Sequence, residues 1–268
     1  MRTTSLQSVR ASALLLAFTA TLTVTLAGGC QSAPAVREPA SAPSGDGAGA
    51  TPLPQQGQRT AVPDGINAKF LDPTTDVDDY VARWEIESRE VYACRDQIVE
   101  ALQLEAGDRV ADIGTGTGLF LEPLSAAVGP RGKVYATDIS MVFLEHVRNR
   151  VKEHDWVQVQ PILSGMRTTA LLENSIDTAF TCDVYHHFGY HEDMLSSIHS
   201  ALRPGGTLVI VDFERIPGVT REWLLEHVRA PKETVIAEVT AAGFQLETEV
   251  PIDGFEENYL LRFAAVPK

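Results

Sequence analysis

The stretch from Val110 to Gly118 reads V-A-D-I-G-T-G-T-G, and it decides the fold of this chain. Residues 110–113 form a short apolar run with one acid, which is typical of a buried parallel strand. Three glycines then alternate with two threonines, and glycine lets the backbone turn tightly or approach a ligand closely. The apolar residues 119–121 begin a helix. Strand, glycine turn and helix N-terminus together predict a nucleotide-sized cradle at the carboxyl edge of a sheet.

The spacing of the glycines narrows the class of ligand that this motif can bind. A dinucleotide-binding fingerprint has glycines at its first, third and sixth positions, but the sixth position counted from Gly114 is Leu119. This spacing disfavours a nicotinamide-dependent oxidoreductase. Asp112 precedes the first glycine by two residues, which gives the pattern D-x-G-x-G-x-G. That pattern resembles motif I of the class I S-adenosylmethionine-dependent methyltransferases; the alternative is a glycine-rich turn in another α/β domain.

Strands and helices alternate along the rest of the chain. Apolar and β-branched runs predict strands near 110–113, 133–137, 157–163, 176–182, 207–212, 244–250 and 257–266. Apolar periodicity and capping residues predict helices near 76–84, 88–102, 119–128, 140–151, 192–202, 220–230 and 231–242. We therefore expect an α/β fold with a doubly wound, mostly parallel seven-stranded sheet. The last strand should be antiparallel, because no helix separates the final two strands. Over residues 85–268 this arrangement resembles the class I methyltransferase fold.

The charge balance argues against nucleic acid as a substrate. The chain of 268 residues has a net charge of -14, although residues 1–60 hold four basic side chains and only two acidic ones. The remaining residues therefore carry 18 basic and 34 acidic side chains, a balance of -16. Such a domain repels phosphate backbones. The hydrophobic fraction of 44% is sufficient for one α/β domain with a real core.

The first 30 residues have the composition of an export signal. Arg2 and Arg10 flank a short N-terminal segment, and an apolar run from Ala11 to Ala27 follows it. The run is short for a membrane span and fits a secretory segment. The run ends in A-G-G-C at Cys30, which resembles the bacterial lipobox, although Ala27 stands where leucine is usual. The resemblance implies that Cys30 is lipidated and becomes the mature N-terminus. Ordinary cleavage near this point and an uncleaved anchor are the alternatives.

A tether follows the signal. Pro, Gly, Ala and Ser supply 18 of the residues 31–60, so this stretch has too few large apolar side chains to bury a core. We therefore divide the chain into a lipoprotein-type signal peptide (1–30), a disordered Pro/Ala/Gly/Ser linker (31–66) and a methyltransferase domain (67–268). The division implies an exported lipoprotein, anchored on the periplasmic or outer face of a bacterial membrane. In such a compartment a bridge between Cys94 and Cys182 is permitted, but two buried thiols are the simpler prediction.

The resemblance assigns cofactor-binding residues. Asp112 would orient the glycine loop and help to hold the amino group of S-adenosylmethionine, and Asp138, at the end of the second strand, would accept the ribose hydroxyls. Ile139 would lie along the adenine, and Asp183 would contact the cofactor from the end of the fourth strand. The cofactor-binding residues implied by the family are Asp112, Gly114, Thr115, Gly116, Gly118, Asp138, Ile139 and Asp183.

One position departs from the family pattern. Many members place an acid after the third strand, where it meets the adenine amino group. In this chain the corresponding residues are Ser164, Gly165 and Met166, which include no acid. We therefore expect the backbone or Ser164 to contact adenine instead.

His186 and His187 are the candidate catalytic residues. They follow the fourth strand, where the family places residues that face the transferred methyl, and a histidine can accept a proton from an acceptor atom. A pocket wall or a helix cap is the alternative role. We predict no metal site, because adjacent histidines are expected to point apart and no ligand spacing supports one.

A second polar group follows the fifth strand. It comprises Asp212, Arg215, His227 and Arg229. These side chains could select a polar acceptor, but a solvated surface cluster is the interpretation that the sequence favours slightly.

The sequence therefore predicts methyl transfer from S-adenosylmethionine to a small-molecule acceptor by an enzyme tethered to a membrane through Cys30. Export separates such an enzyme from the cytoplasm, where the cofactor is made. The alternative that answers this tension is a non-catalytic lipoprotein that has the same fold and binds a ligand or partner.

Overall fold

A computed structural model describes residues 62–267 of the chain. The expected signal peptide, the lipidation residue Cys30 and the linker up to residue 61 lie outside the described residues. Residues 64–67 form turns, and Ile66 is buried, so the folded part begins slightly before the expected boundary at residue 67.

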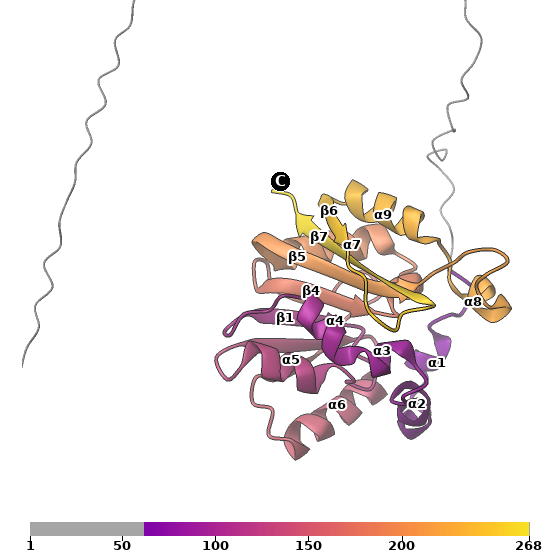
Figure 1. The fold of residues 1–268 in the computed structure, drawn as a ribbon. Coiled ribbons are helices and arrows are strands. Elements are labelled where there is room, and N and C mark those ends of the chain that lie inside the picture. The colour runs from indigo at the N-terminus through magenta and orange to yellow at the C-terminus, as the bar shows by residue number, and fades with distance from the viewer. Residues whose placement is uncertain (1–61, 268) are drawn as a thin grey trace, which may run out of the picture. The chain divides into compact units, whose positions relative to one another are not determined.

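Seven strands form one sheet in the order β3-β2-β1-β4-β5-β7-β6 (Figure 1). The parallel pairs are β1 with β2, β1 with β4, β2 with β3, and β4 with β5. β7 is antiparallel to both β5 and β6, so the predicted fold class and the antiparallel last strand are confirmed. The strands are β1 (Arg109–Ile113), β2 (Lys133–Asp138), β3 (Val159–Leu163), β4 (Ile176–Cys182), β5 (Leu202–Phe213), β6 (Phe244–Glu249) and β7 (Asn258–Ala265).

Helices cover both faces of the sheet (Figure 1). They are α1 (Ala68–Leu71), α2 (Val77–Trp84), α3 (Glu90–Ala93), α4 (Arg95–Ala101), α5 (Leu121–Val128), α6 (Met141–Glu153), the 3-10 turn η1 (Tyr185–His187), α7 (His191–Ala201), α8 (Glu222–His227) and α9 (Lys232–Ala241). Side chains alternate between the two faces of each strand. On β5, for example, Val209 and Val211 pack with α3–α6, whereas Leu208 and Ile210 pack with α7 and α9. The result is a sheet between two apolar layers, which explains its nearly continuous apolar strands.

Two predicted helices differ from the structure. The helix expected over 88–102 is divided at Cys94, whose thiol donates a hydrogen bond to the carbonyl oxygen of Asp253 at 3.3 Å. The helix expected over 220–230 is limited to α8. The Arg215 guanidinium donates to the carbonyl oxygens of Leu225 and Val228 at 3.0 and 2.8 Å, so it satisfies the acceptors at the helix end.

Cys94 and Cys182 are free thiols, which confirms the prediction of no bridge, but only Cys94 is buried and Cys182 is half-buried. Within residues 62–267, no helix combines the length and the hydropathy that crossing a membrane requires.

Candidate functional site

A cavity of about 1060 Å³ opens where four parallel strands end. Ile113 of β1, Asp138 of β2, Cys182 of β4 and Phe213 of β5 all contribute to its wall. The carboxyl edge of the central strands is where open α/β folds bind their ligands. The glycine loop after β1 forms one side, and η1 and α8 form another.

The glycine loop is held tightly against its surroundings. Gly114 has a φ of +75°, and a Cβ at this position would lie 2.6 Å from Cγ1 of Val184. At Gly116 a Cβ would lie 3.0 Å from the ring of Trp84, which belongs to the cavity wall. The Thr115 hydroxyl donates to Asp112 at 2.7 Å, so the acid before the loop fixes its conformation. The loop is therefore glycine-rich for two reasons: its backbone conformation and the close approach of neighbouring side chains.

Asp138 connects the glycine loop to β2. One of its carboxylate oxygens accepts the N–H of Gly116 at 2.9 Å, and the other accepts the N–H of Ser140 at 2.8 Å. Burial raises the pKa of Asp138 to about 6 and that of Asp112 to about 7, because both carboxylates are removed from water. Both lie in the cavity wall, together with the predicted Ile139 and with the acid-free segment 164–166. Gly118 lies outside this wall, where a Cβ would meet Leu121.

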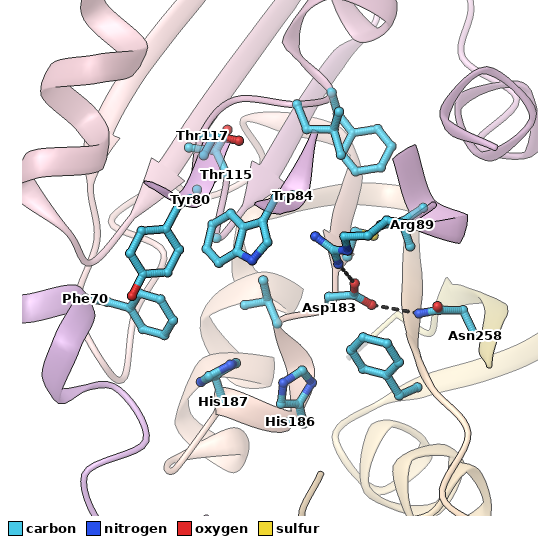
Figure 2. Close-up of a pocket in the computed structure, with 18 of the residues that line it drawn as sticks. Phe70, Tyr80, Trp84, Arg89, Thr115, Thr117, Asp183, His186, His187 and Asn258 are labelled. Atoms are coloured by element: carbon cyan, nitrogen blue, oxygen red, sulfur yellow. Dashed lines mark hydrogen bonds and ion pairs between the residues drawn. The ribbon is translucent and has the colours of Figure 1, made fainter. Parts of the chain in front are cut away.

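An aromatic cluster from α1, α2 and α6 closes one side of the cavity. The sequence analysis did not predict this cluster. The ring of Trp84 stacks on Phe143 with centroids 5.6 Å apart, and Tyr80 meets Trp84 edge-on at 4.7 Å. Phe70 lies beside them and also meets the His187 ring at 5.4 Å (Figure 2). The four rings come from α1, α2 and α6, so only the folded chain brings them to the glycine loop.

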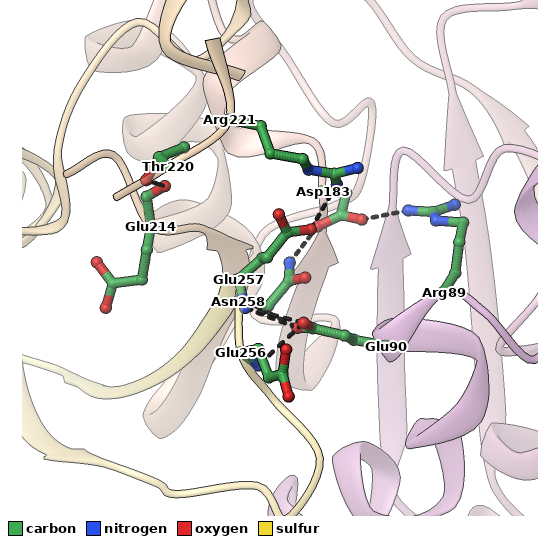
Figure 3. A network of polar contacts seen from close by, with 9 residues as sticks. All are labelled: Arg89, Glu90, Asp183, Glu214, Thr220, Arg221, Glu256, Glu257 and Asn258. Carbon is green, nitrogen blue, oxygen red and sulfur yellow. Dashed lines mark hydrogen bonds and ion pairs between the residues drawn. The ribbon is translucent and has the colours of Figure 1, made fainter. Parts of the chain in front are cut away.

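Asp183 lies in the cavity wall but is engaged by protein groups. Its carboxylate forms an ion pair with Arg89 and accepts a hydrogen bond from the Asn258 amide at 2.8 Å (Figures 2 and 3). Burial raises the pKa of Asp183 to about 6, and the charge of Arg89 opposes this shift. Asp183 therefore positions Arg89, and its direct contact with the cofactor stays a prediction.

Glu90 extends this network to the last hairpin. Its carboxylate accepts the backbone N–H groups of residues 256–258 at 2.9 to 3.1 Å (Figure 3). The network therefore ties α3 to the loop before β7, and it holds Arg89 at the cavity.

The two predicted catalytic histidines lie side by side in η1 and have different partners. His186 is buried, and its Nδ1 lies 2.7 Å from Oδ1 of Asp212. His187 Nδ1 lies 3.0 Å from Oδ1 of Asn67, on the segment just before α1. Burial, with the neighbouring histidines His186 and His227, lowers the pKa of His187 to about 2. Burial likewise lowers the pKa of His227 to about 4. His187 and His227 are consequently uncharged near neutral pH.

The geometric reason for predicting no metal site is wrong. His186, His187 and His227 each place one ring nitrogen within 4.8 Å of the other two, so the adjacent histidines converge instead of pointing apart. Both residues belong to η1, and the centroids of their rings lie 4.4 Å apart.

The polar group after β5 is not a solvated surface cluster. Asp212 is buried and holds His186, and Arg215 caps α8 as described above. Arg229 is also buried and pairs with Glu238 at 2.6 Å, beneath the ring of Tyr185. Of these four side chains, His227 lines the cavity, whereas Asp212, Arg215 and Arg229 hold neighbouring groups in place.

Comparisons with known proteins agree with this geometry. Residues 110–206 match the profile of a family described as "Methyltransferase domain". An uncharacterized 37.1 kDa protein in transposon TN4556 of Streptomyces fradiae is 34% identical over 42% of this chain and 32% of its own length. The ubiquinone/menaquinone biosynthesis C-methyltransferase UbiE of Ectopseudomonas mendocina is 29% identical over 45% of this chain and 47% of its own length. The chain thus spans between a third and a half of the length of these curated relatives.

Solved structures share the fold. A SAM-dependent methyltransferase from Aquifex aeolicus superposes with a TM-score of 0.63 at 21% identity, over 71% of this chain and 99% of that chain. A geranyl diphosphate C-methyltransferase from Streptomyces coelicolor, solved with S-adenosyl-L-homocysteine, has a TM-score of 0.58 at 14% identity, over 74% and 84%.

Fold and site together define the class I methyltransferase architecture. Within it, residues 110–206 match a methyltransferase domain, and S-adenosylmethionine is the cofactor that this match supports.

Proposed function

We propose that this protein transfers a methyl group from S-adenosylmethionine to a small-molecule acceptor. The observation that carries the proposal is one cavity that joins the D-x-G-x-G-x-G loop and Asp138 to a chamber with histidines and aromatic rings. Its volume of about 1060 Å³ is at the upper end of the roughly 300–1,000 Å³ of ordinary ligand pockets, so it has room for cofactor and acceptor together.

The cofactor would lie across the glycine loop. Asp138 stands where it can accept the ribose hydroxyls, with Ile139 beside it on the adenine side. Ser164 and Met166 line the same part of the wall and stand where the family's acid is missing. Arg89 supplies the positive charge that the methionine carboxylate needs, and Asp183 holds its guanidinium in place.

The acceptor would lie between the aromatic cluster and η1. In the transfer the acceptor atom attacks the sulfonium methyl, its proton passes to a base, and the methyl–sulfur bond breaks to leave S-adenosylhomocysteine. His186 suits the base role better than His187, because its ring is oriented by the hydrogen bond to Asp212, whereas the lowered pKa of His187 makes that residue a poor proton acceptor. Positioning of the two reactants and exclusion of water supply the rest of the rate.

We also propose that the domain is exported and held at a membrane by lipid on Cys30. The apolar run before A-G-G-C and the composition of residues 31–60 support this. Cells that express the chain should incorporate labelled palmitate into it, and Cys30→Ser should abolish the label and release the protein from membranes. An unlabelled protein in the cytosolic fraction would refute the anchor without affecting the proposed activity.

The cofactor is tested first, by thermal unfolding of the full chain with S-adenosylmethionine, S-adenosylhomocysteine or NAD. A ligand at about 100 times its Kd stabilises the folded state by about 2.7 kcal/mol. Stabilisation by the two sulfur ligands and not by NAD, lost in Asp138→Ala, is the expected result. A folded protein that none of them stabilises would overturn the proposal. Cofactor binding without methyl transfer to any acceptor in a broad panel would favour the non-catalytic alternative.

A further inference from the structure

Three histidines gather on the wall of the acceptor chamber from two segments about forty residues apart. His186 and His187 belong to η1, and His227 is the last residue of α8. The ring centroids of His186 and His227 lie 4.9 Å apart, and those of His187 and His227 lie 5.2 Å apart. One ring nitrogen of each residue lies within 4.8 Å of the other two. We call these residues the histidine triad.

Hydrogen bonds fix the proton on two of the three rings. Oδ1 of Asp212 also accepts the backbone N–H of Phe213 at 2.8 Å, so it is the acceptor in the 2.7 Å contact and His186 carries its proton on Nδ1. The second carboxylate oxygen of Asp212 accepts the backbone N–H of His186 at 3.0 Å, which holds the acid in this orientation.

Asn67 fixes the position of the ring proton on His187. The Asn67 amide nitrogen donates to the carbonyl oxygen of His187 at 3.1 Å, and this contact identifies the amide oxygen as the atom that faces the His187 ring. His187 Nδ1 therefore donates to Asn67. In both histidines the lone pair remains on Nε2.

This is the arrangement of histidines that bind metal ions. Such residues commonly donate one ring N–H to a carboxylate or carbonyl oxygen, which sets the tautomer and makes the other nitrogen the ligand. Nitrogen ligands favour zinc and the neighbouring transition metals, whereas magnesium and calcium prefer oxygen. Three histidine ligands with one open position are typical of zinc sites that also bind a reactant.

We propose that His186, His187 and His227 bind one divalent transition-metal ion of the zinc class, with an open coordination position toward the acceptor chamber. In a tetrahedral site with metal–nitrogen distances of about 2.0–2.1 Å, ligand nitrogens lie roughly 3.4 Å apart. The triad therefore needs only small ring movements to close around an ion. Trp223 and Phe213 border the same part of the cavity, so the open position faces a partly apolar space.

The ion changes what His186 does. Its Nε2 becomes a metal ligand instead of a proton acceptor, and the open position can hold an oxygen or nitrogen atom of the acceptor. This consequence for the acceptor rests on the proposed methyltransferase function, whereas metal binding itself does not.

The test is calorimetric titration of the full chain, stripped of metal with a chelator, with zinc sulfate. We expect one zinc ion to bind per chain and His227→Ala to weaken that binding at least tenfold. His154→Ala is the matched control, because His154 is an exposed histidine that stacks on Trp156 away from the triad. This variant should bind zinc like the wild type.

Three further measurements accompany the titration. Cobalt in place of zinc should give the strong visible absorption of a low-coordinate site in the wild type and lose it in His227→Ala. Asn67→Ala, which removes the hydrogen-bond partner of His187, should weaken zinc binding by about tenfold, as loss of such a supporting group commonly does. Metal-free thermal unfolding of each variant shows whether it is folded.

Equal zinc affinity in the wild type and in a folded His227→Ala variant would overturn the proposal, as would a folded wild type that binds no zinc. S-adenosylhomocysteine binding is measured separately on the same samples. Zinc binding without cofactor binding would refute the methyltransferase proposal alone, and the reverse result would refute the metal site alone.

Discussion

Replacing Gly114 by alanine tests the structural reason for the first glycine of the loop. Two costs are expected. Gly114 has a φ of +75°, and an L-residue in the left-handed region costs about 1–2 kcal/mol. The new Cβ would also lie 2.6, 2.7 and 3.1 Å from Cγ1, Cγ2 and Cβ of Val184, and forcing an extra methyl into packed surroundings costs about 1–3 kcal/mol.

Gly218→Ala separates the two costs. Gly218 has a φ of +80°, and a Cβ there would have nothing within 4 Å. It should therefore incur only the backbone cost. The expected loss in the free energy of unfolding is about 1–2 kcal/mol for Gly218→Ala and about 2–5 kcal/mol for Gly114→Ala.

The assay is urea unfolding at 25 °C, supported by thermal unfolding. For a domain of about 200 residues, each kcal/mol moves Tm by about 2–4 °C, so the two variants should differ by about 2–12 °C. Adding Val184→Ala to Gly114→Ala should recover part of the difference, because it removes the two nearest atoms. Equal destabilisation by the two glycine variants, or no recovery in the double variant, would refute the packing argument.

Three other outcomes follow from the site. The pKa of Asp138 is raised to about 6, and the ionised form of Asp138 would accept the ribose hydroxyls. The Kd for S-adenosylmethionine should therefore rise about tenfold for each pH unit below 6. An Asp138→Asn variant with the same pH profile would contradict this. Burial raises the pKa of Asp112 from 3.8 to about 7, so the folded state binds more protons than the unfolded chain, and the free energy of unfolding should fall as pH rises from about 4 to 7. Urea unfolding across this range should show a shallower decline in Asp112→Asn, and an unchanged slope would refute the assignment. S-adenosylhomocysteine should change the tryptophan fluorescence of the wild type and of Trp156→Phe. An undiminished change in Trp84→Phe that is lost in Trp223→Phe, the other tryptophan of the cavity wall, would place the cofactor away from α2.

The fold was largely predictable because its signals are local. Buried parallel strands are nearly continuous apolar runs, glycine and proline mark their ends, and the missing helix before residues 257–266 indicated the antiparallel strand. The errors occurred where a distant group ends or interrupts an element. Asp253 contacts the break at Cys94, and Arg215 caps α8. Neither contact leaves a periodic signal in the sequence.

The residues of the site also fall into those that the sequence predicts and those that only the folded chain brings together. The sequence by itself determined the glycine loop and the acids at the ends of β1 and β2, because these residues follow their strands directly and the sheet brings strand ends together. Only the tertiary structure decided which partner each buried polar group has. In the folded chain Asp183 pairs with Arg89, and His186 forms a hydrogen bond with Asp212. His227 lies beside the two adjacent histidines, although about forty residues of chain separate them. Such pairings depend on side-chain packing between elements that are far apart in sequence, and the requirement that buried polar groups find partners does not say which partner they find.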